Sequence, residues 1–128
     1  MPTILFLCVK NSGRSQIAEG LARAMAPPGY RFLSAGSDPG TVSPLAVQAL
    51  AEQQIDISTQ RAKGLASIPL DAVDTIVTLC AEEICPVVPG QVRRLHWPLP
   101  DPQDLATFRA VRDELRRRLP ALWDQLER

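Results

Sequence analysis

Two residues that could do chemistry stand close together near the start of the chain. Cys8 and Arg14 bracket a loop of five residues, Val-Lys-Asn-Ser-Gly. The apolar run Thr3–Leu7 before the loop predicts a buried parallel strand, and the pattern Ser15–Met25 after it predicts a helix. Unpaired N–H groups at a helix start and in a tight loop bind anions, and an arginine matches two oxygens of a tetrahedral oxyanion. In that positive field the thiolate of Cys8 is favoured as a nucleophile.

A purely structural role for Cys8 is the alternative, because a lone cysteine that ends an apolar strand is often a small buried hydrophobic residue. Its neighbours favour the oxyanion site: Gly13 lets a ligand approach the backbone, and Ser15 can cap the helix or donate its hydroxyl to the thiolate. For Asn11 we favour a bracing role, and for the Lys10 side chain a solvent-facing one. The predicted oxyanion-binding residues are Val9, Lys10, Asn11, Ser12, Gly13, Arg14 and Ser15.

Apolar strand patterns alternate with helical patterns along the whole chain. The predicted strands are Thr3–Leu7, Tyr30–Ala35, Thr75–Leu79 and Val92–Trp97, and the predicted helices are Ser15–Met25, Pro44–Gln53 and Gln103–Gln125, with a short helix around Arg61–Ala66. This alternation indicates an α/β domain with a parallel sheet, whose ligands bind at the carboxyl ends of the strands. Cys8, Cys80 and Asp101 each follow a strand, so we expect them at one rim. Pro120 is expected to kink or split the last helix.

Length and composition fit one domain over residues 1–128. The 14 basic and 14 acidic residues balance, so nothing points to nucleic acid or a membrane surface as a partner. There is no basic leader and no apolar stretch of membrane-spanning length, so we expect a cytoplasmic protein, with a monomer fitting its size. Three cysteines and one histidine favour catalytic or redox use over a disulfide framework or a metal site.

The loop, continued by Ser15-Gln-Ile-Ala-Glu-Gly20, resembles the active-site loop of the low-molecular-weight protein tyrosine phosphatase fold. Its Ser-Gln form resembles the thiol-dependent arsenate reductases of that fold, where phosphatases usually carry Ser-Pro. The similarity covers most of the chain in family order, through Ser34-Ala-Gly36, Val42-Ser-Pro44, Ile55-Asp-Ile-Ser58, Val77-Thr-Leu-Cys80, His96-Trp97 and Asp101-Pro102. It implies a three-layer α/β fold with a central four-stranded parallel sheet flanked by helices.

The resemblance also implies a reaction. Cys8 would attack arsenate, for which phosphate or sulfate are mimics, and Asp101 would act as the general acid. Cys80 would then attack Cys8, and Cys85 would resolve that disulfide for an external reductant, either thioredoxin or a glutaredoxin with a low-molecular-weight thiol. In a regular helix residues 80 and 85 would have Cα atoms roughly 8–9 Å apart, beyond the reach of a disulfide. We therefore predict a redox-coupled rearrangement of this segment.

No tightly bound cofactor is implied, but some related reductases hold a potassium ion near the loop, and Asn11 and Ser34 could contribute to such a site. Two other functions stay open. A phosphomonoester hydrolase of the phosphatase type would use water instead of Cys80 to cleave the cysteinyl adduct. A sensing module for oxyanions or thiols would bind without turnover. His96 and Trp97 are expected to belong to the scaffold.

Overall fold

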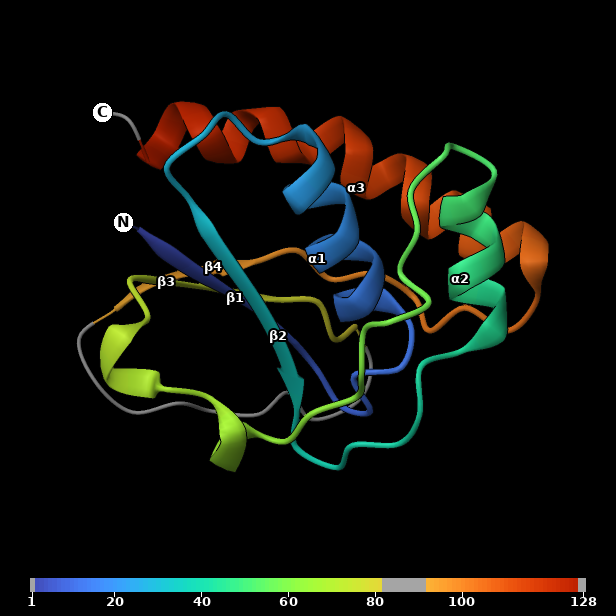
Figure 1. Cartoon of the computed structure of the whole chain (residues 1–128), viewed down its shortest axis with the longest axis horizontal. Helices are drawn as coiled ribbons and strands as arrows, with labels where there is room; N and C mark the ends of the chain where they lie inside the picture. The colour runs from blue at the N-terminus through green and yellow to red at the C-terminus, as the bar shows by residue number, and fades with distance from the viewer. Residues whose placement is uncertain (1, 82–91, 127–128) are drawn as a thin grey trace.

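The computed structural model describes residues 2–81 and 92–126. Its elements are β1 (Thr3–Cys8), α1 (Arg14–Met25), β2 (Arg31–Gly36), α2 (Pro44–Ala51), the 3-10 turns η1 (Leu65–Ser67) and η2 (Leu70–Ala72), β3 (Thr75–Thr78), β4 (Arg93–His96) and α3 (Leu105–Leu126). The strands form one parallel sheet in the order β2-β1-β3-β4 (Figure 1). The predicted α/β class is confirmed, and every predicted strand and long helix is present.

The sheet has a hydrophobic core on each face because successive residues of a strand point in opposite directions. Ile4 and Phe6 of β1 face the larger core, where α1, α2 and α3 pack together on one side of the sheet (Figure 1). Leu5 and Leu7 face a smaller core that includes the segment 65–73. In the described part of the chain, the second flanking layer therefore consists of η1 and η2 in place of a long helix.

The predicted short helix around Arg61–Ala66 is wrong. This segment runs without helical structure up to Gly64, because its backbone is held by neighbours on both sides. The Lys63 N–H donates to Asn11 Oδ1 at 2.8 Å, and the Lys63 carbonyl accepts from the Gly36 N–H at 2.9 Å. The chain therefore stays alongside the end of β2 and turns only afterwards, in η1 and η2.

Helix α3 buries one apolar face, as its spacing predicts, against α1 and α2 and, through Trp123, against Phe32 of β2. Its buried residues are Phe108, Val111, Arg112, Leu115, Leu119, Leu122 and Trp123. The helix runs continuously through Pro120, so the expected split does not occur. Pro120 lies on the exposed side, and the buried Leu119 and Trp123 on either side of it anchor the helix to the core.

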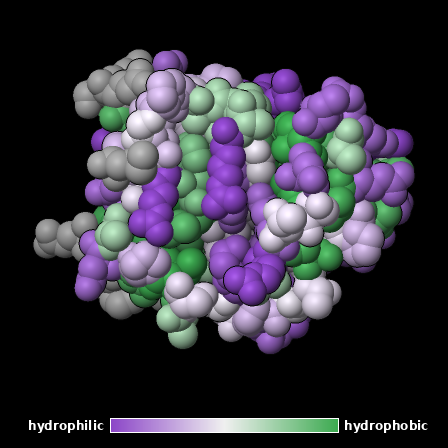
Figure 2. Space-filling view, viewed as in Figure 1, coloured by the Kyte–Doolittle hydropathy of each residue, from purple (hydrophilic) through white to green (hydrophobic). Residues whose placement is uncertain are grey.

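Ion pairs join α3 to the end of α2. Arg112 donates to the Ala49 carbonyl at 2.9 Å and to Glu52 at 2.8 Å, and Arg109 makes a two-pronged contact with the same carboxylate. On the face drawn in Figure 2, hydrophobic residues lie scattered among hydrophilic ones without forming one broad apolar patch. In the described residues, no helix is both long enough and apolar enough to cross a membrane.

Candidate active site

The loop between β1 and α1 is held in an unusual backbone path by one buried residue. Asn11 has a φ of 52°, a left-handed conformation that asparagine tolerates better than most residues. Its side-chain oxygen accepts from the Lys63 N–H and from Gln16 Nε2, both at 2.8 Å. Its Nδ2 donates to Ser15 Oγ at 2.7 Å. Asn11 thus braces the loop, as predicted.

The segment after β2 runs along the loop and binds its carbonyl oxygens. The N–H groups of Asp38, Gly40 and Ser43 donate to the carbonyls of Val9, Lys10 and Ser12, respectively, at 2.8–2.9 Å. With these carbonyls turned toward the neighbouring segment, the loop can present its N–H groups to the other side, which is the geometry of an anion nest. The end of β2 can lie this close to the loop only because residue 36 is glycine. A Cβ at Gly36 would lie 2.3 Å from the Val9 carbonyl oxygen.

A cavity of about 140 Å³ opens on that other side. The residues lining it are Cys8, Val9, Lys10, Ser12, Gly13, Arg14 and Asp101. Five of the seven predicted oxyanion-binding residues line this cavity. The other two, Asn11 and Ser15, are fully buried and bonded to one another. The volume suits a small tetrahedral ion.

Arg14 is buried, and main-chain oxygens orient it. Its Nη1 donates to the Leu99 carbonyl at 2.9 Å and to the Leu79 carbonyl at 3.4 Å. Its Nη2 lies 3.8 Å from Asp101 Oδ1, and that carboxylate is 62% exposed. The guanidinium is therefore positioned by the segment before Cys80 and by the segment before Asp101. These two segments and the loop that carries Arg14 meet around the guanidinium.

Cys8 is buried at the base of the cavity, with its Sγ 2.8 Å from Ser15 Oγ. Ser15 was expected either to cap α1 or to contact the Cys8 sulfur, and the structure shows the second role. The N-cap of α1 is Gly13, and no side chain forms a cap hydrogen bond there. When Cys8 reacts as a thiolate, the Ser15 hydroxyl is the donor in this contact, because a thiolate can only accept.

Gln16 joins the start of α1 to the segment 60–61. Its Nε2 donates to the Asn11 carbonyl and to the Arg61 carbonyl, at 3.0 and 2.9 Å, and its Oε1 accepts from Gln60 at 2.7 Å. A proline at this position could make none of these bonds. The Ser-Gln form of the loop therefore has a structural role in this chain, namely to hold Asn11 and its neighbours in place.

Cys8, Cys80 and Asp101 lie at one rim of the sheet, as predicted. The Leu79 N–H donates to the Leu7 carbonyl at 2.9 Å, so Cys8 and Cys80 each come one residue after this bonded pair on adjacent strands. Asp101 reaches the same rim through the loop after β4, lining the cavity. Cys80 is buried and takes part in a disulfide, whereas Cys8 is free. Cys85, and with it the predicted rearrangement, lies outside the described residues.

The residues considered for potassium are already engaged with other partners. Glu19 is 3% exposed; Arg23 lies 2.7 Å and Lys63 Nζ 3.6 Å from its carboxylate, and Ser34 donates to it. Asn11 Oδ1 already accepts two hydrogen bonds. Two side-chain cations, those of Arg23 and Lys63, thus face the buried carboxylate of Glu19. Within residues 2–81 and 92–126, no cluster of three or more acidic, cysteine or histidine side chains forms a metal site.

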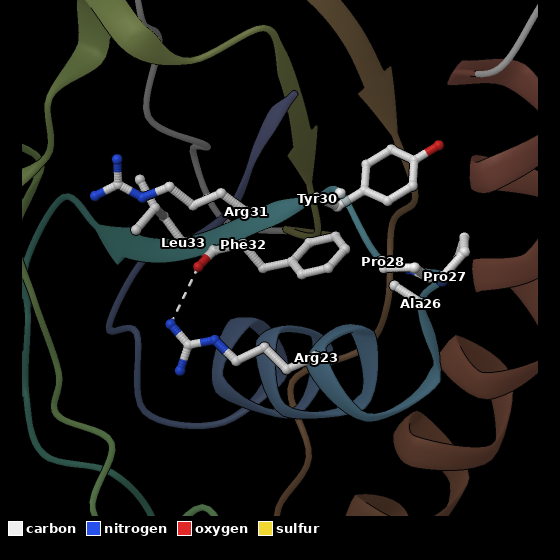
Figure 3. Close-up of a pocket in the computed structure, with 9 residues that line it drawn as sticks. Arg23, Ala26, Pro27, Pro28, Tyr30, Arg31, Phe32 and Leu33 are labelled. Atoms are coloured by element: carbon white, nitrogen blue, oxygen red, sulfur yellow. Dashed lines mark hydrogen bonds between the residues drawn. The ribbon is translucent and has the colours of Figure 1, made fainter. Parts of the chain in front are cut away.

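A wider hollow of about 430 Å³ lies between the end of α1 and the start of β2 (Figure 3). Because the strands are parallel, this hollow is at the opposite end of the sheet from Cys8. Its Arg23 reaches across to the Phe32 carbonyl at 3.1 Å and also pairs with Glu19. Among the described residues that line the hollow there is no cysteine. Its Arg23 has a structural role on the edge strand β2.

Sequence reasoning missed several residues that support the site: Gln60, Lys63, Asp38, and the carbonyls of Leu79 and Leu99. Each of them acts across a long separation in sequence, and Gln60, Lys63, Asp38 and Leu99 belong to none of the motifs named above. Leu79 lies within Val77-Thr-Leu-Cys80 and Gly36 within Ser34-Ala-Gly36, but neither motif predicts the backbone contact that the residue makes. His96 joins the scaffold as predicted, with Nδ1 2.6 Å from Thr78 Oγ1.

A buried cysteine at the end of β1, an arginine at the start of α1 and an aspartate lining the same cavity are the residue types expected at an oxyanion site of the phosphatase type. Residues 3–128 match the family model "Low molecular weight phosphotyrosine protein phosphatase", and the chain belongs to this family. Among curated proteins it is similar to arsenate reductase 1 of Bacillus cereus, with 40% identity over 121 residues that cover 91% of this chain and 90% of the relative.

Two solved structures extend this comparison. One is an arsenate reductase in the phosphate binding state, with 31% identity, a TM-score of 0.87 and 98% coverage of both chains. The other is a thioredoxin-dependent arsenate reductase of Corynebacterium glutamicum, with 33% identity and a TM-score of 0.81, covering 100% of this chain and 64% of that one. The resemblance found in the sequence is thereby confirmed at the level of family and fold.

Proposed function

We propose that the protein is an arsenate reductase that works through a cysteinyl-arsenate adduct and an intramolecular thiol relay. One observation carries the proposal: Cys8 in the oxyanion loop and Cys80 come one residue after the bonded pair Leu7 and Leu79 on adjacent strands. A hydrolase needs the first cysteine but has no use for the second. The names of the relatives support the same activity.

In the first step the loop N–H groups and Arg14 bind arsenate inside the cavity. The Cys8 thiolate attacks arsenic, a sulfur–arsenic bond forms, and an arsenic–oxygen bond breaks. Asp101, on the cavity wall within 3.8 Å of the Arg14 guanidinium, donates a proton to the leaving oxygen, which departs as water. Burial of Arg14 keeps its charge close to the oxyanion and away from bulk solvent.

In the second step the Cys80 thiolate attacks Cys8 Sγ. A Cys8–Cys80 disulfide forms, the sulfur–arsenic bond breaks, and its electron pair goes to arsenic, which is reduced from As(V) to As(III) and leaves as arsenite. The two cysteines are thereby oxidised. Because Leu79 contacts both Arg14 and Leu7 through its backbone, movement of Cys80 toward Cys8 also changes the surroundings of the guanidinium.

In the third step Cys85 attacks Cys80, which releases Cys8 as a thiolate and leaves a Cys80–Cys85 disulfide. An external dithiol then reduces this disulfide and is itself oxidised. Thioredoxin is the reductant we propose, supported by the thioredoxin-dependent relative. A glutaredoxin with a low-molecular-weight thiol would serve instead if Cys85 failed to resolve the first disulfide.

The test starts from fully reduced protein and follows NADPH oxidation with arsenate, thioredoxin and thioredoxin reductase. Wild type should turn over many times, and Cys8→Ser should be inactive. Cys80→Ser should form one cysteinyl-arsenate adduct, detectable by mass spectrometry, without releasing arsenite. Sustained turnover by Cys80→Ser with thioredoxin would refute the relay.

The second candidate is phosphomonoester hydrolysis, which the family membership favours and which needs the same Cys8, Arg14 and Asp101. Hydrolysis of p-nitrophenyl phosphate that survives Cys80→Ser, in a protein that consumes no NADPH with arsenate, would establish this activity in place of reduction. The two functions are separated by one residue, since only the reductase depends on Cys80.

A further inference from the structure

Lys10 is a second cationic residue among those that line the oxyanion cavity. It belongs to the loop and lines the cavity together with Arg14 and Asp101. Its ammonium is paired with Asp38 of the neighbouring segment. Both side chains are largely exposed, 58% for Lys10 and 70% for Asp38. Exposed ion pairs contribute little to stability, so this pair can separate at small cost.

The charges that line the cavity leave a shortage of positive charge for a dianion. Arg14 supplies one positive charge, and it lies 3.8 Å from the Asp101 carboxylate. A Cys8 thiolate, required for attack, adds a negative charge at the base. Arg14 therefore faces one negative charge while Asp101 carries the proton that it donates in the first step, and two after Asp101 has given it up. A doubly charged tetrahedral ion meets no net positive charge unless a further cation takes part. Among the described residues that line the cavity, Lys10 is the one other cation.

We propose that Lys10 is a substrate-binding residue that moves its ammonium from Asp38 to a dianionic tetrahedral oxyanion when the cavity fills. Asp38 is the counter-ion of Lys10 while the cavity is empty. When the oxyanion binds, the Asp38 carboxylate is left to solvent. This inference rests on the proposed function and deepens it, because it assigns the preference for a dianion to one side chain of the loop.

The backbone around Lys10 allows the exchange. The Lys10 carbonyl accepts from the Gly40 N–H, and the Asp38 N–H donates to the Val9 carbonyl, both at 2.9 Å. These two bonds fix the main chain on both sides of the ion pair, so the side chain can change partner while the loop keeps its shape. A long lysine side chain carries a mobile point charge suited to this role.

The test measures inorganic phosphate binding by calorimetry in a Cys8→Ser background, which needs no turnover. Lys10→Gln should weaken binding about tenfold, the size of one hydrogen bond between charged groups. Lys10→Arg should stay within about threefold of the parent, because it keeps the charge. Asp38→Asn should tighten binding about threefold, because it frees the ammonium. Arg31→Gln, at the far end of β2, is the control for a general change in net charge.

Three results would overturn the proposal. Lys10→Gln could bind phosphate as tightly as the parent, it could lose no more than Arg31→Gln, or Lys10→Arg could lose as much as Lys10→Gln. Weakening by Asp38→Asn would overturn the role of Asp38 as a resting counter-ion. Because phosphate binding is independent of arsenate reduction, a protein that fails the NADPH test can still pass this one.

Discussion

Asn11 donates a hydrogen bond to the Ser15 hydroxyl at 2.7 Å, and this bond decides what Ser15 can do for Cys8. A hydroxyl has one hydrogen to give, and a thiolate can only accept. With Asn11 on one lone pair, the Ser15 hydrogen is left for Cys8 Sγ, 2.8 Å away. The amide of Asn11 cannot turn over, because its oxygen already accepts from Lys63 and Gln16.

Replacing Asn11 by glycine should therefore slow the chemistry of Cys8. Glycine tolerates the left-handed backbone at this position, so Asn11→Gly removes the amide without adding strain. We expect alkylation of Cys8 by iodoacetamide at neutral pH to slow about tenfold, as for the loss of one hydrogen bond to a charged group. Ser43→Ala, which removes the N-cap of α2, is the control for a general loss of stability. Equal alkylation rates in Asn11→Gly and wild type would contradict this account.

Gly36→Ala should damage the site through the backbone. The added Cβ would lie 2.3 Å from the Val9 carbonyl oxygen and 2.9 Å from the Asn11 nitrogen, so the loop must shift. We expect at least tenfold weaker phosphate binding and a loss of about 1–3 kcal/mol in the free energy of unfolding. Gly40→Ala is the matched control, because its Cβ would meet no atom within 4 Å. Similar phosphate affinities in the two variants would show that the close approach at Gly36 is unimportant.

The ion pairs of Glu52 predict a specific dependence of stability on pH. Hydrogen bonds from Arg109, and then from Arg112, lower the pKa of Glu52 from 4.5 to about 2. A carboxylate with a lowered pKa in the folded state stabilises the protein above its unfolded pKa, and that stabilisation is lost as the pH falls toward the folded value. The urea midpoint of wild type should exceed that of Glu52→Gln by a constant amount above about pH 5, and the difference should shrink between pH 4.5 and about 2.

The control for this measurement is Asp124→Asn, which changes an exposed carboxylate on α3. A difference for Asp124→Asn that followed the same course as that for Glu52→Gln would point to a general effect of removing a carboxylate. If the difference in urea midpoint between wild type and Glu52→Gln stays constant down to pH 2.5, Arg109 and Arg112 do not hold the Glu52 carboxylate in its charged form.

The thermal midpoint should be the same in KCl and in NaCl of equal ionic strength. Glu19 already faces the cationic groups of Arg23 and Lys63, so a metal cation has no uncompensated carboxylate to bind. A midpoint that rises in KCl alone would mean that potassium displaces Lys63 from Glu19. The measurement is the thermal midpoint followed by circular dichroism in KCl and in NaCl. Choline chloride, whose cation is not a metal, is the third condition.

The local part of the site could be predicted from the sequence because it is continuous in the chain. Strand, loop and helix follow one another from Thr3 to Met25, and the loop has the composition of an anion nest. The rim positions of Cys80 and Asp101 followed from the rule that parallel strands present their carboxyl ends together. Their roles still rest on the resemblance to the reductases.

The parts that could not be predicted depend on contacts between distant residues. The segment around Arg61 has helical spacing, but its backbone bonds to Gly36 and Asn11 outweigh that preference. Pro120 breaks the rule for helix interiors, because the packing of its neighbours in the core outweighs the lost hydrogen bond. The main-chain anchors of Arg14 carry no sequence signal at all, since any residue supplies a carbonyl oxygen.

The anchors of Arg14 also constrain how the protein is made. The loop from Cys8 to Arg14 is synthesised before the carbonyls that hold its arginine, which belong to Leu79 and Leu99. Contacts over such separations form late, after the intervening chain has been synthesised and folded. A nascent chain that carries only the first half of the sequence therefore exposes its thiol before the anion pocket exists. Cys8 is thus translated before the residues that complete the cavity around it, and the cavity forms only when the sheet is closed.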